Sequence, residues 1–398
     1  MKKTYATLLL TSMIALTLGA VNHVEASQKS TNAITFEQRI GGKDTDTAKS
    51  VIVLDDGYLI VGKSRSFSKN RFFNIYIIKL DKNGDKIWSK HLGTKEDEEG
   101  NAVVETDDGF VIVGSSDKLG NDRKSIYLVK IQKSGKFIWE RAFYSYKYDY
   151  YSGNDIVKRK NGFMIAATER HPKLFNEQID AYILSADKSG QVVGKRRFGG
   201  DDEDMANAII ETAGDFIFAG ATESFGHGDL DAYVLKMDDR GNRLWSRAFG
   251  GSDDDVAHDI IEVSDGYVLV GTTESFGRRY SDVYVVKMNK NGNRVWHKAY
   301  GGTKDEEGYA IIEDNGGYII AGKASSYGES FRSDMYLFKI SKTGDLLWER
   351  IFGQKQDDAA YDLAATKDGY IIVGEISDER TRDKDVYIVK TDKNGRVK

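Results

Sequence analysis

"RLWSRAFGGSDDDVAHDIIEVSDGYVLVGTTESFGRRYSDVYVVKMNKNGN", residues 243–293, contains four short runs rich in Val, Ile, Tyr and Phe. The runs are RLWSRAF, AHDIIEV, GYVLVGT and DVYVVKM, and polar or glycine-bearing turns separate them, as expected of β-strands. The closing KNGN segment suits a tight hairpin, because Asn and Gly tolerate the positive φ values that such a turn needs. The stretch therefore predicts a unit of four antiparallel strands.

The same unit recurs along the chain at intervals of about 51 residues. In five copies a tryptophan stands four residues after a turn glycine: Trp88, Trp139, Trp245, Trp296 and Trp348. The tyrosine of the DVYVVKM run occurs in all seven copies: Tyr76, Tyr127, Tyr182, Tyr233, Tyr284, Tyr336 and Tyr387. Four strands per unit of this length are typical of a β-propeller blade. The sequence therefore predicts an all-β, seven-bladed β-propeller over residues 34–398.

The two ends of the repeated region complement one another. The last copy stops one residue before its outer-strand tryptophan would come. The missing strand is present at the other end as AITFEQRIGG, residues 33–42, with Phe36 in the tryptophan place. An open ring would leave unpaired sheet edges, which promote aggregation. We therefore expect the leading strand to complete the last blade and close the ring.

The first 26 residues have the layout of a secretory signal peptide. Lys2 and Lys3 form a short basic start, residues 6–21 are apolar, and Val24-Glu25-Ala26 fits a small-x-small cleavage site. The apolar run is shorter than the ~20 residues of a membrane-spanning helix, and an uncleaved N-terminal anchor is the alternative. We expect a signal peptide over residues 1–26, a short linker over residues 27–33, and a mature chain that is secreted to the extracellular space or the periplasm.

The composition argues against several classes of function. Removing residues 1–26 would change the formal net charge from −5 to −6, and the mixed charges argue against binding to nucleic acid or to a membrane surface. Without cysteine, the chain has no disulfide, no thiolate nucleophile and no thiolate metal ligand. The G-x-S-x-G and H-E-x-x-H motifs are absent, and the histidines are scattered. We expect a monomer with no organic cofactor, no nucleic-acid partner and no membrane span.

The repeated pattern is similar to that of a known family. The motif D-x-Y-x-x-K, followed by G-x-x-x-W-x-x-x-[FY]-G-G and an alanine, resembles the SBBP-type β-propeller repeat of bacteria and archaea. It is less similar to the blades of PQQ-like outer-membrane assembly lipoproteins. The resemblance covers residues 34–398 and implies a propeller without implying a particular chemistry. The copy at 140–194 departs most from the pattern, with Gly194 for the tryptophan, Ser185 for the lysine and Ala167 for a strand glycine.

Two repeated positions have a structural interpretation. We expect the tryptophans to pack between neighbouring blades, because an aromatic ring buries roughly 150–250 Å². A lysine recurs in the third strand of six copies: Lys79, Lys130, Lys236, Lys287, Lys339 and Lys390. These lysines are expected to lie over the indole rings as cation–π partners.

An acidic residue precedes the predicted innermost strand in six of the seven copies: Asp46, Glu98, Asp204, Asp255, Glu306 and Asp358. In a closed propeller these side chains would form a ring at one mouth of the central channel. Crowded carboxylates repel one another and favour a bound cation, for which Ca²⁺ is the candidate because it takes oxygen ligands. The alternative is that each carboxylate caps backbone N–H groups of its own loop.

The third copy has a different loop at this place, FYSYKYDYYSGND, residues 143–155. It carries five tyrosines: Tyr144, Tyr146, Tyr148, Tyr150 and Tyr151. The following loop of the same copy, TERHPKLFNEQID, contains His171 and the only proline of the chain. In a propeller both loops lie on one face. Tyrosine rings suit stacking on a sugar or contact with a protein, although the tyrosines could instead fill the space of the missing tryptophan.

These features favour a secreted, non-catalytic propeller that binds an extracellular polysaccharide or protein through its loop-rich face. The five tyrosines and His171 are the predicted ligand-binding residues, and the six acidic residues are the predicted metal ligands. Two alternatives stay open. One is a carboxylate-dependent glycoside hydrolase or lyase that acts on an extracellular polymer, and the other is a structural or interaction module of the cell envelope.

Overall fold

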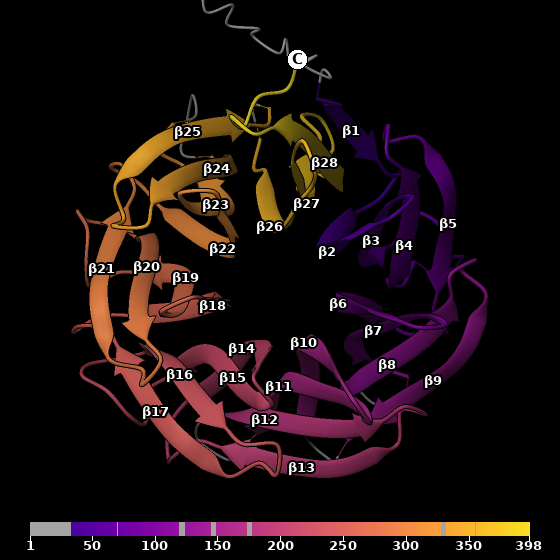
Figure 1. Ribbon diagram of the computed structural model, residues 1–398. Helices are drawn as coiled ribbons and strands as arrows, with labels where there is room; N and C mark the ends of the chain where they lie inside the picture. Colours follow the sequence, from indigo (N-terminus) through magenta and orange to yellow (C-terminus); the bar gives the residue numbers. More distant parts are fainter. Residues whose placement is uncertain are drawn as a thin grey trace, which may run out of the picture. The chain divides into compact units, whose positions relative to one another are not determined.

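Seven four-stranded antiparallel sheets are arranged around a common axis in the computed structural model (Figure 1). The structure describes residues 33–69, 71–118, 124–144, 149–172, 177–327, 332–354 and 356–398, and no helix occurs within them. The predicted all-β, seven-bladed β-propeller is thereby confirmed. The predicted signal peptide and residues 27–32 of the predicted linker lie outside the described residues.

Six blades are continuous in the sequence, and each runs from an inner strand near the axis to an outer strand at the rim (Figure 1). Blades 1 and 2 contain β2 (Asp46–Leu54), β3 (Gly57–Ser64), β4 (Asn74–Asp81), β5 (Lys86–Leu92), β6 (Glu98–Thr106), β7 (Gly109–Ser116), β8 (Ser125–Gln132) and β9 (Phe137–Phe143). Blades 3 and 4 contain β10 (Tyr150–Arg159), β11 (Gly162–Pro172), β12 (Glu177–Asp187), β13 (Val192–Phe198), β14 (Asp204–Thr212), β15 (Asp215–Thr222), β16 (Asp231–Met237) and β17 (Arg243–Phe249). Blades 5 and 6 contain β18 (Asp255–Val263), β19 (Gly266–Thr273), β20 (Asp282–Asn289), β21 (Arg294–Tyr300), β22 (Glu306–Asp314), β23 (Gly317–Ala324), β24 (Asp334–Ser341) and β25 (Leu346–Phe352).

Blade 7 combines strands from both ends of the described chain. Its order is β1 (Phe36–Ile40), β28 (Lys384–Asp392), β27 (Gly369–Ser377) and β26 (Ala359–Ala365), so β1 is the outer strand. β1 pairs antiparallel with β28, with Phe36 opposite Lys390. The Phe36 ring lies against Gly84 in the outer hairpin of blade 1. Phe36 therefore contacts the next blade in the way that the tryptophans of other blades do.

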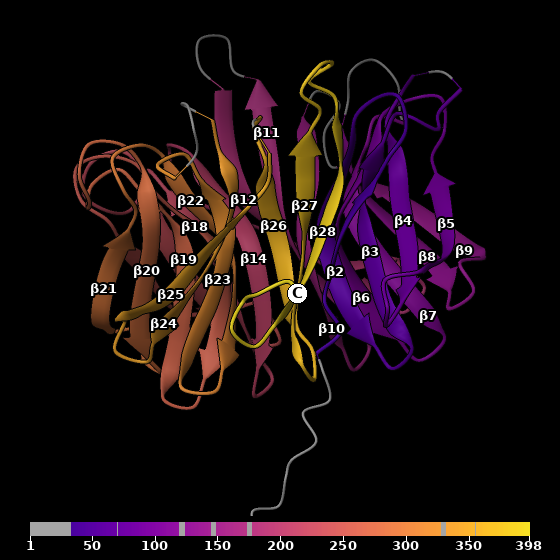
Figure 2. The same cartoon turned by 90° about the horizontal axis from the view of Figure 1, so that it is seen from above.

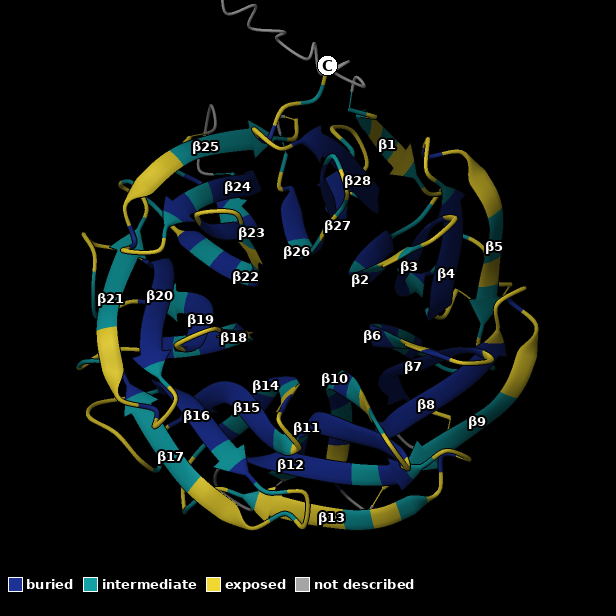
Figure 3. Ribbon diagram, in the orientation of Figure 1, coloured by how far each residue is buried: buried dark blue, intermediate teal, exposed yellow. Residues whose placement is uncertain are grey.

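The apolar core lies between the blades. The described residues form seven clusters of buried side chains, and each cluster joins two consecutive blades, including blade 7 with blade 1. Figure 3 shows that the two middle strands of the blades are mostly buried, that the inner strands alternate buried with half-buried residues, and that the outer strands are half-buried or exposed. Since burial of apolar surface is the main favourable term in folding, each blade depends on both of its neighbours for stability.

Four of the tryptophans pack on the outer hairpin of the next blade, as their repeated place predicts, whereas the nearest side chains to Gly344 are Lys298 and Tyr300. The Trp245 ring lies so close to Gly292 that a Cβ there would meet it at 2.9 Å. Gly292 has φ +76, which favours glycine in addition to the close approach. The same contact joins Trp88 to Gly135 and Trp139 to Gly190.

The lysines of the third strands do not have the predicted partner. Each pairs with a carboxylate of the hairpin between the first and second strands: Lys79–Asp56, Lys130–Asp108, Lys236–Asp215, Lys287–Asp265, Lys339–Asp314 and Lys390–Asp368. The cations over indole rings in the described residues include Arg141, Arg247 and Arg350, which stand two residues after the tryptophans. The predicted Lys–Trp contact was wrong because a buried ammonium gains more from a carboxylate than from an aromatic face.

Candidate functional site

Blade 3 carries a group of ionisable side chains at the face that bears its loops. The start of β10, the end of β11, the start of β12 and the end of β13 meet there, because neighbouring strands of the blade are antiparallel. Figure 2 shows β11 ending at this face. In the antiparallel register Tyr151 of β10 is opposite Glu169 of β11. The hydroxyl group of Tyr151 donates a hydrogen bond to Glu169.

This pair reverses an arrangement found in other blades. In blade 1 the acidic Asp46 is opposite Ser64, and in blade 4 Asp204 is opposite Thr222. Blade 3 has the hydroxyl group on the inner strand and the carboxylate on the second strand. The exchange moves the carboxylate outward by one strand, toward β12.

His171 joins three carboxylates at this place, and we call Asp149, Glu169, His171 and Asp180 the carboxylate–histidine cluster. The Nδ1 atom of His171 lies 2.8 Å from Oδ1 of Asp149. Its Nε2 atom lies 3.3 Å from Oε2 of Glu169 and 3.5 Å from Oδ2 of Asp180. The three carboxylates are buried. Within the described residues, Asp149, Glu169 and His171 are the group whose ligand atoms all lie within 4.8 Å of one another.

Arg197 of β13 supplies a positive charge beside the cluster. Its Nε atom lies 2.6 Å from Oε2 of Glu169 and 3.5 Å from Oδ2 of Asp180. Burial raises the pKa of Asp180, and the charges of Arg197 and His171 oppose that rise. Three buried carboxylates thus face one guanidinium and one imidazole.

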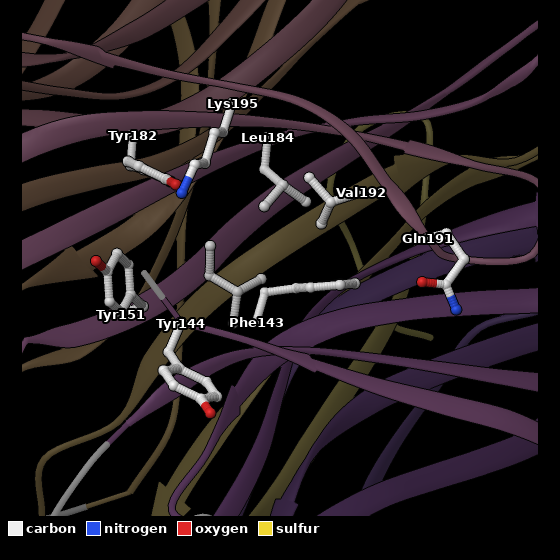
Figure 4. A pocket seen from close by; sticks show the side chains of 9 residues that line it. Phe143, Tyr144, Tyr151, Tyr182, Leu184, Gln191, Val192 and Lys195 are labelled. Atoms are coloured by element: carbon white, nitrogen blue, oxygen red, sulfur yellow. The ribbon is translucent and has the colours of Figure 1, made fainter. Parts of the chain in front are cut away.

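A pocket of about 280 Å³ lies next to the cluster, between blades 2 and 3 (Figure 4). It is lined by Ile126, Phe143, Tyr144, Tyr151, Tyr182, Leu184, Gln191, Val192 and Lys195. Tyr151 belongs to both features, because its ring lines the pocket while its hydroxyl group contacts Glu169. The pocket and the cluster therefore form one continuous site on blade 3.

The predicted ligand-binding residues have different environments. Tyr144 is 56% exposed and Tyr150 is 37% exposed, whereas Tyr151 is 1% exposed. Tyr146 and Tyr148 lie outside the described residues. His171 is in the carboxylate–histidine cluster. Tyr144 and Tyr150 are thus accessible to a ligand at the surface, whereas Tyr151 is buried.

The alternative that these tyrosines replace the missing tryptophan is not supported for the described ones. The missing ring would lie over Gly241 of blade 4, where a groove of about 380 Å³ is lined by Ser185, Gly194 and Gly241 among others. Arg196 is the nearest side chain to Gly241. Neither Tyr144 nor Tyr151 lines this groove, since both are at the opposite side of blade 3.

The six predicted metal ligands are buried near the start of the inner strands, and each accepts a backbone hydrogen bond from its own loop. The donors and acceptors are Gly42 and Asp46, Thr94 and Glu98, Gly200 and Asp204, Gly251 and Asp255, Gly302 and Glu306, and Gln354 and Asp358. These hydrogen bonds are the ones expected from the alternative interpretation, in which each carboxylate caps backbone N–H groups of its own loop. A cation ring at these positions, with Ca²⁺ as its ion, stays a prediction.

Five of these carboxylates have a second acid beside them across a loop glycine, and one such pair lies at the contact between blades 6 and 7. Asp358 and Asp334 both flank Gly353. Burial raises the pKa of each to about 6, and the charge of Asp358 adds to the rise at Asp334. Unfolded aspartate has a pKa of about 3.9. The stability from each group is therefore complete below about pH 4 and is lost as the pH rises through about 6.

Asp334→Asn is expected to stabilise the protein, and the gain should grow by about 1 kcal/mol between pH 5 and pH 7.5. The amide cannot ionise, and blade 1 already has Asn74 at the equivalent place, beside Glu98. Urea unfolding at the two pH values measures the effect. Asp202→Asn at an exposed position is the control, and an equal gain at both pH values for Asp334→Asn would contradict the explanation.

Sequence reasoning found His171 and the tyrosines but missed Asp149, Glu169, Asp180 and Arg197. One signal was available for Glu169, which stands where five other blades have serine, threonine or alanine. Asp149 lies within the Tyr-rich stretch, and the tyrosines around it were the residues that the sequence analysis singled out. Asp180 is the usual acid of the third strand and has no distinguishing feature in the sequence.

No protein-family model matches this chain. A curated relative, the regulatory protein FlaEY of Caulobacter vibrioides, is 26% identical, and the match covers 51% of this chain and 23% of FlaEY. The chain therefore spans under a quarter of the length of that relative. No helix in the described residues is both long and apolar enough to cross a membrane.

Two solved structures with little sequence identity are similar to this chain. A puromycin hydrolase is 10% identical with a TM-score of 0.52, and the match covers 89% of this chain and 54% of that chain. Sqt1 from Chaetomium thermophilum is 11% identical with a TM-score of 0.48, over 85% and 82% of the two chains. At such identity the likeness to the puromycin hydrolase shows the propeller fold alone.

Proposed function

We propose that this protein is a secreted, non-catalytic β-propeller that binds an extracellular polysaccharide through the loop-bearing face of blade 3. The observation that carries the proposal is the exposed ring of Tyr144 at the pocket of blade 3, with a second exposed tyrosine, Tyr150, at the start of β10. An exposed tyrosine offers an apolar face and a hydroxyl group at low cost in conformational entropy. Sugars present the complementary combination of C–H faces and hydroxyl groups.

Three further features suit this function. The pocket is open to solvent at Tyr144, Gln191 and Lys195, which place hydrogen-bonding groups around an apolar floor. Tyr151 fixes the base of the pocket, because its hydroxyl group is held by Glu169. Exceptional residues on a regular scaffold are the usual place for binding. The likeness to the SBBP-type repeat and the expected signal peptide are consistent with a role outside the cytoplasm.

A hydrolase is less well supported by this site. Glycosidases use two carboxyl groups that face the substrate across several ångströms. At the carboxylate–histidine cluster, Glu169 is engaged by Tyr151 and Arg197, and Asp149 is engaged by His171. Carboxylates with such partners orient other groups and are poorly placed to attack or protonate a glycosidic bond.

The double substitution Tyr144→Ala/Tyr150→Ala is expected to weaken binding of the recognised glycan by about tenfold or more, because each ring contributes stacking worth roughly 1 kcal/mol. Arrays of glycans and peptidoglycan fragments identify the glycan, and calorimetry measures its affinity. Tyr280→Ala is the matched control, since Tyr280 is 42% exposed on blade 5. Equal affinity of the double variant and the wild type would overturn this location, and binding of proteins alone would favour the interaction-module alternative.

A further inference from the structure

Blade 3 has an open groove at the place where four other blades hold their own tryptophan ring. The groove has a volume of about 380 Å³ and lies between β13 and the outer hairpin of blade 4. In blade 4 the indole ring of Trp245 lies over Gly292 of the next blade, whereas blade 3 has Gly194 at the corresponding position of β13. The missing ring would cover Gly241, whose nearest side chain is Arg196. The place of one indole ring is therefore free for another group.

Apolar side chains form the floor of this groove. Met164 of β11, Ile183 of β12 and Met237 of β16 line it, and all three are buried. Methionine adapts its shape to the group that packs on it and makes favourable contacts with aromatic rings. A flat apolar ring that enters the groove would therefore leave water for a surface that suits it.

The rim of the groove is positively charged. Arg159 at the end of β10, Arg196 of β13 and Arg240 in the outer hairpin of blade 4 all line it. In the part of the chain that the structure describes, none of these guanidinium groups forms an ion pair with a carboxylate. Asp239 is the acidic residue of the lining. Since positive charges prevail around an apolar floor, an acidic ligand complements the groove.

Arg196 stands where blade 4 places a cation over its tryptophan. The equivalent residue, Arg247, lies with its Cζ atom 5.6 Å from the centroid of the Trp245 ring. Arg196 is exposed and has no indole ring beside it, because residue 194 is glycine. An aromatic ring placed over Gly241 would give Arg196 the cation–π contact that Arg247 already has.

We propose that this groove binds a tryptophan side chain from an acidic segment of a partner protein. The contact between Trp245 and Gly292 is the model for the bound state, since there a tryptophan side chain packs between two blades in the same way. The three arginines stand on different elements around the groove, which suits several carboxylates along a peptide better than the single charge of a free aromatic acid. The inference goes beyond the proposed binding of a polysaccharide, because the groove and Tyr144 are on opposite sides of blade 3.

Fluorescence anisotropy of a dye-labelled peptide, Glu-Asp-Trp-Asp-Glu, tests the proposal with the full chain. We expect saturable binding, and replacement of the peptide tryptophan by alanine should weaken it by about tenfold or more, because the ring supplies the apolar contact. Added salt should weaken binding of the acidic peptide, since salt screens exposed charges. If indole-3-acetate binds as tightly as the peptide, the groove is a site for a small aromatic acid and the proposed partner is wrong.

Gly194→Trp fills the groove with the ring that the repeat would place there. Binding of the peptide should then fall by about tenfold or more, because the chain's own indole occupies the site. Among the described residues, a Cβ atom at position 194 would meet the Ser185 hydroxyl group, which can rotate away, so we expect the variant to fold. Val295→Trp adds a ring at the equivalent, 59% exposed position before the tryptophan of blade 5 and is the control that should leave the affinity unchanged.

The double substitution Arg196→Ala/Arg240→Ala leaves the groove open and tests the charges separately. It should weaken peptide binding severalfold and remove most of its dependence on salt. Tyr144→Ala should leave peptide binding unchanged, so a failure of the polysaccharide site and a failure of this groove can be told apart. Absence of saturable binding, binding that survives Gly194→Trp, or an unchanged affinity of the double arginine variant would overturn the proposal.

Discussion

Trp245→Gly is expected to lower the free energy of unfolding by about 3–5 kcal/mol, as other removals of large core aromatics do. The Trp245 ring packs on Gly292 of blade 5 and lies 6.2 Å from the Tyr267 ring, measured between centroids. It also belongs to the apolar cluster that joins blades 4 and 5. Urea unfolding measures the loss.

The chain offers two comparisons for this prediction. Leu244→Ala, at the neighbouring and 50% exposed residue, should change stability by less than about 0.5 kcal/mol. Gly194→Trp restores the repeat in blade 3, where the groove of about 380 Å³ is open beside Gly241, and should raise the midpoint of unfolding. A loss at Trp245→Gly no larger than that at Leu244→Ala would show that the blades do not depend on the tryptophan contact.

Asp368→Ala is expected to cost about 3–5 kcal/mol, because it leaves the ammonium of Lys390 buried without its charge partner. The amine of Lys390 lies 2.9 Å from Asp368, and its side chain is 1% exposed. Burial already lowers the pKa of Lys390, and Asp368 opposes that change. Thermal and urea unfolding at pH 7 report the loss. Glu105→Ala breaks the exposed pair with Lys133 and should leave the stability almost unchanged, because solvent-exposed ion pairs contribute little.

Blade 3 indicates that the charges of Asp368 and Lys390 depend on one another. It has Ser185 in place of the lysine and Asn161 before β11, where blade 7 has Asp368 before β27, so both charges are absent together. The double variant Asp368→Asn/Lys390→Ser should therefore lose less stability than the sum of its single variants, because no unpaired charge is left in the interior. Additive losses would show that the ion pair itself contributes no coupling.

Much of the fold could be predicted because its signals are local. The hairpin between the third and fourth strands of each blade needs a glycine with positive φ, and the strands alternate inward and outward residues. Both requirements are met by residues that are close together in the sequence, and both recur in every blade. The lysines of the third strands show the limit of this reasoning. The position was recognised, but its partner Asp368, 22 residues from Lys390, follows from strand pairing that the repeat alone does not reveal.

By itself the sequence determined the number of blades, the place of the tryptophan contacts and the identity of the exceptional blade. Only the tertiary structure decided which of its residues meet. Asp149, Glu169, His171, Asp180 and Arg197 come from the beginnings and ends of four strands, and antiparallel register brings them to one point. The register also buries Tyr151 while Tyr144 stays exposed. Strand composition specifies local conformation, whereas a site depends on how distant strands are paired and on which side each residue faces.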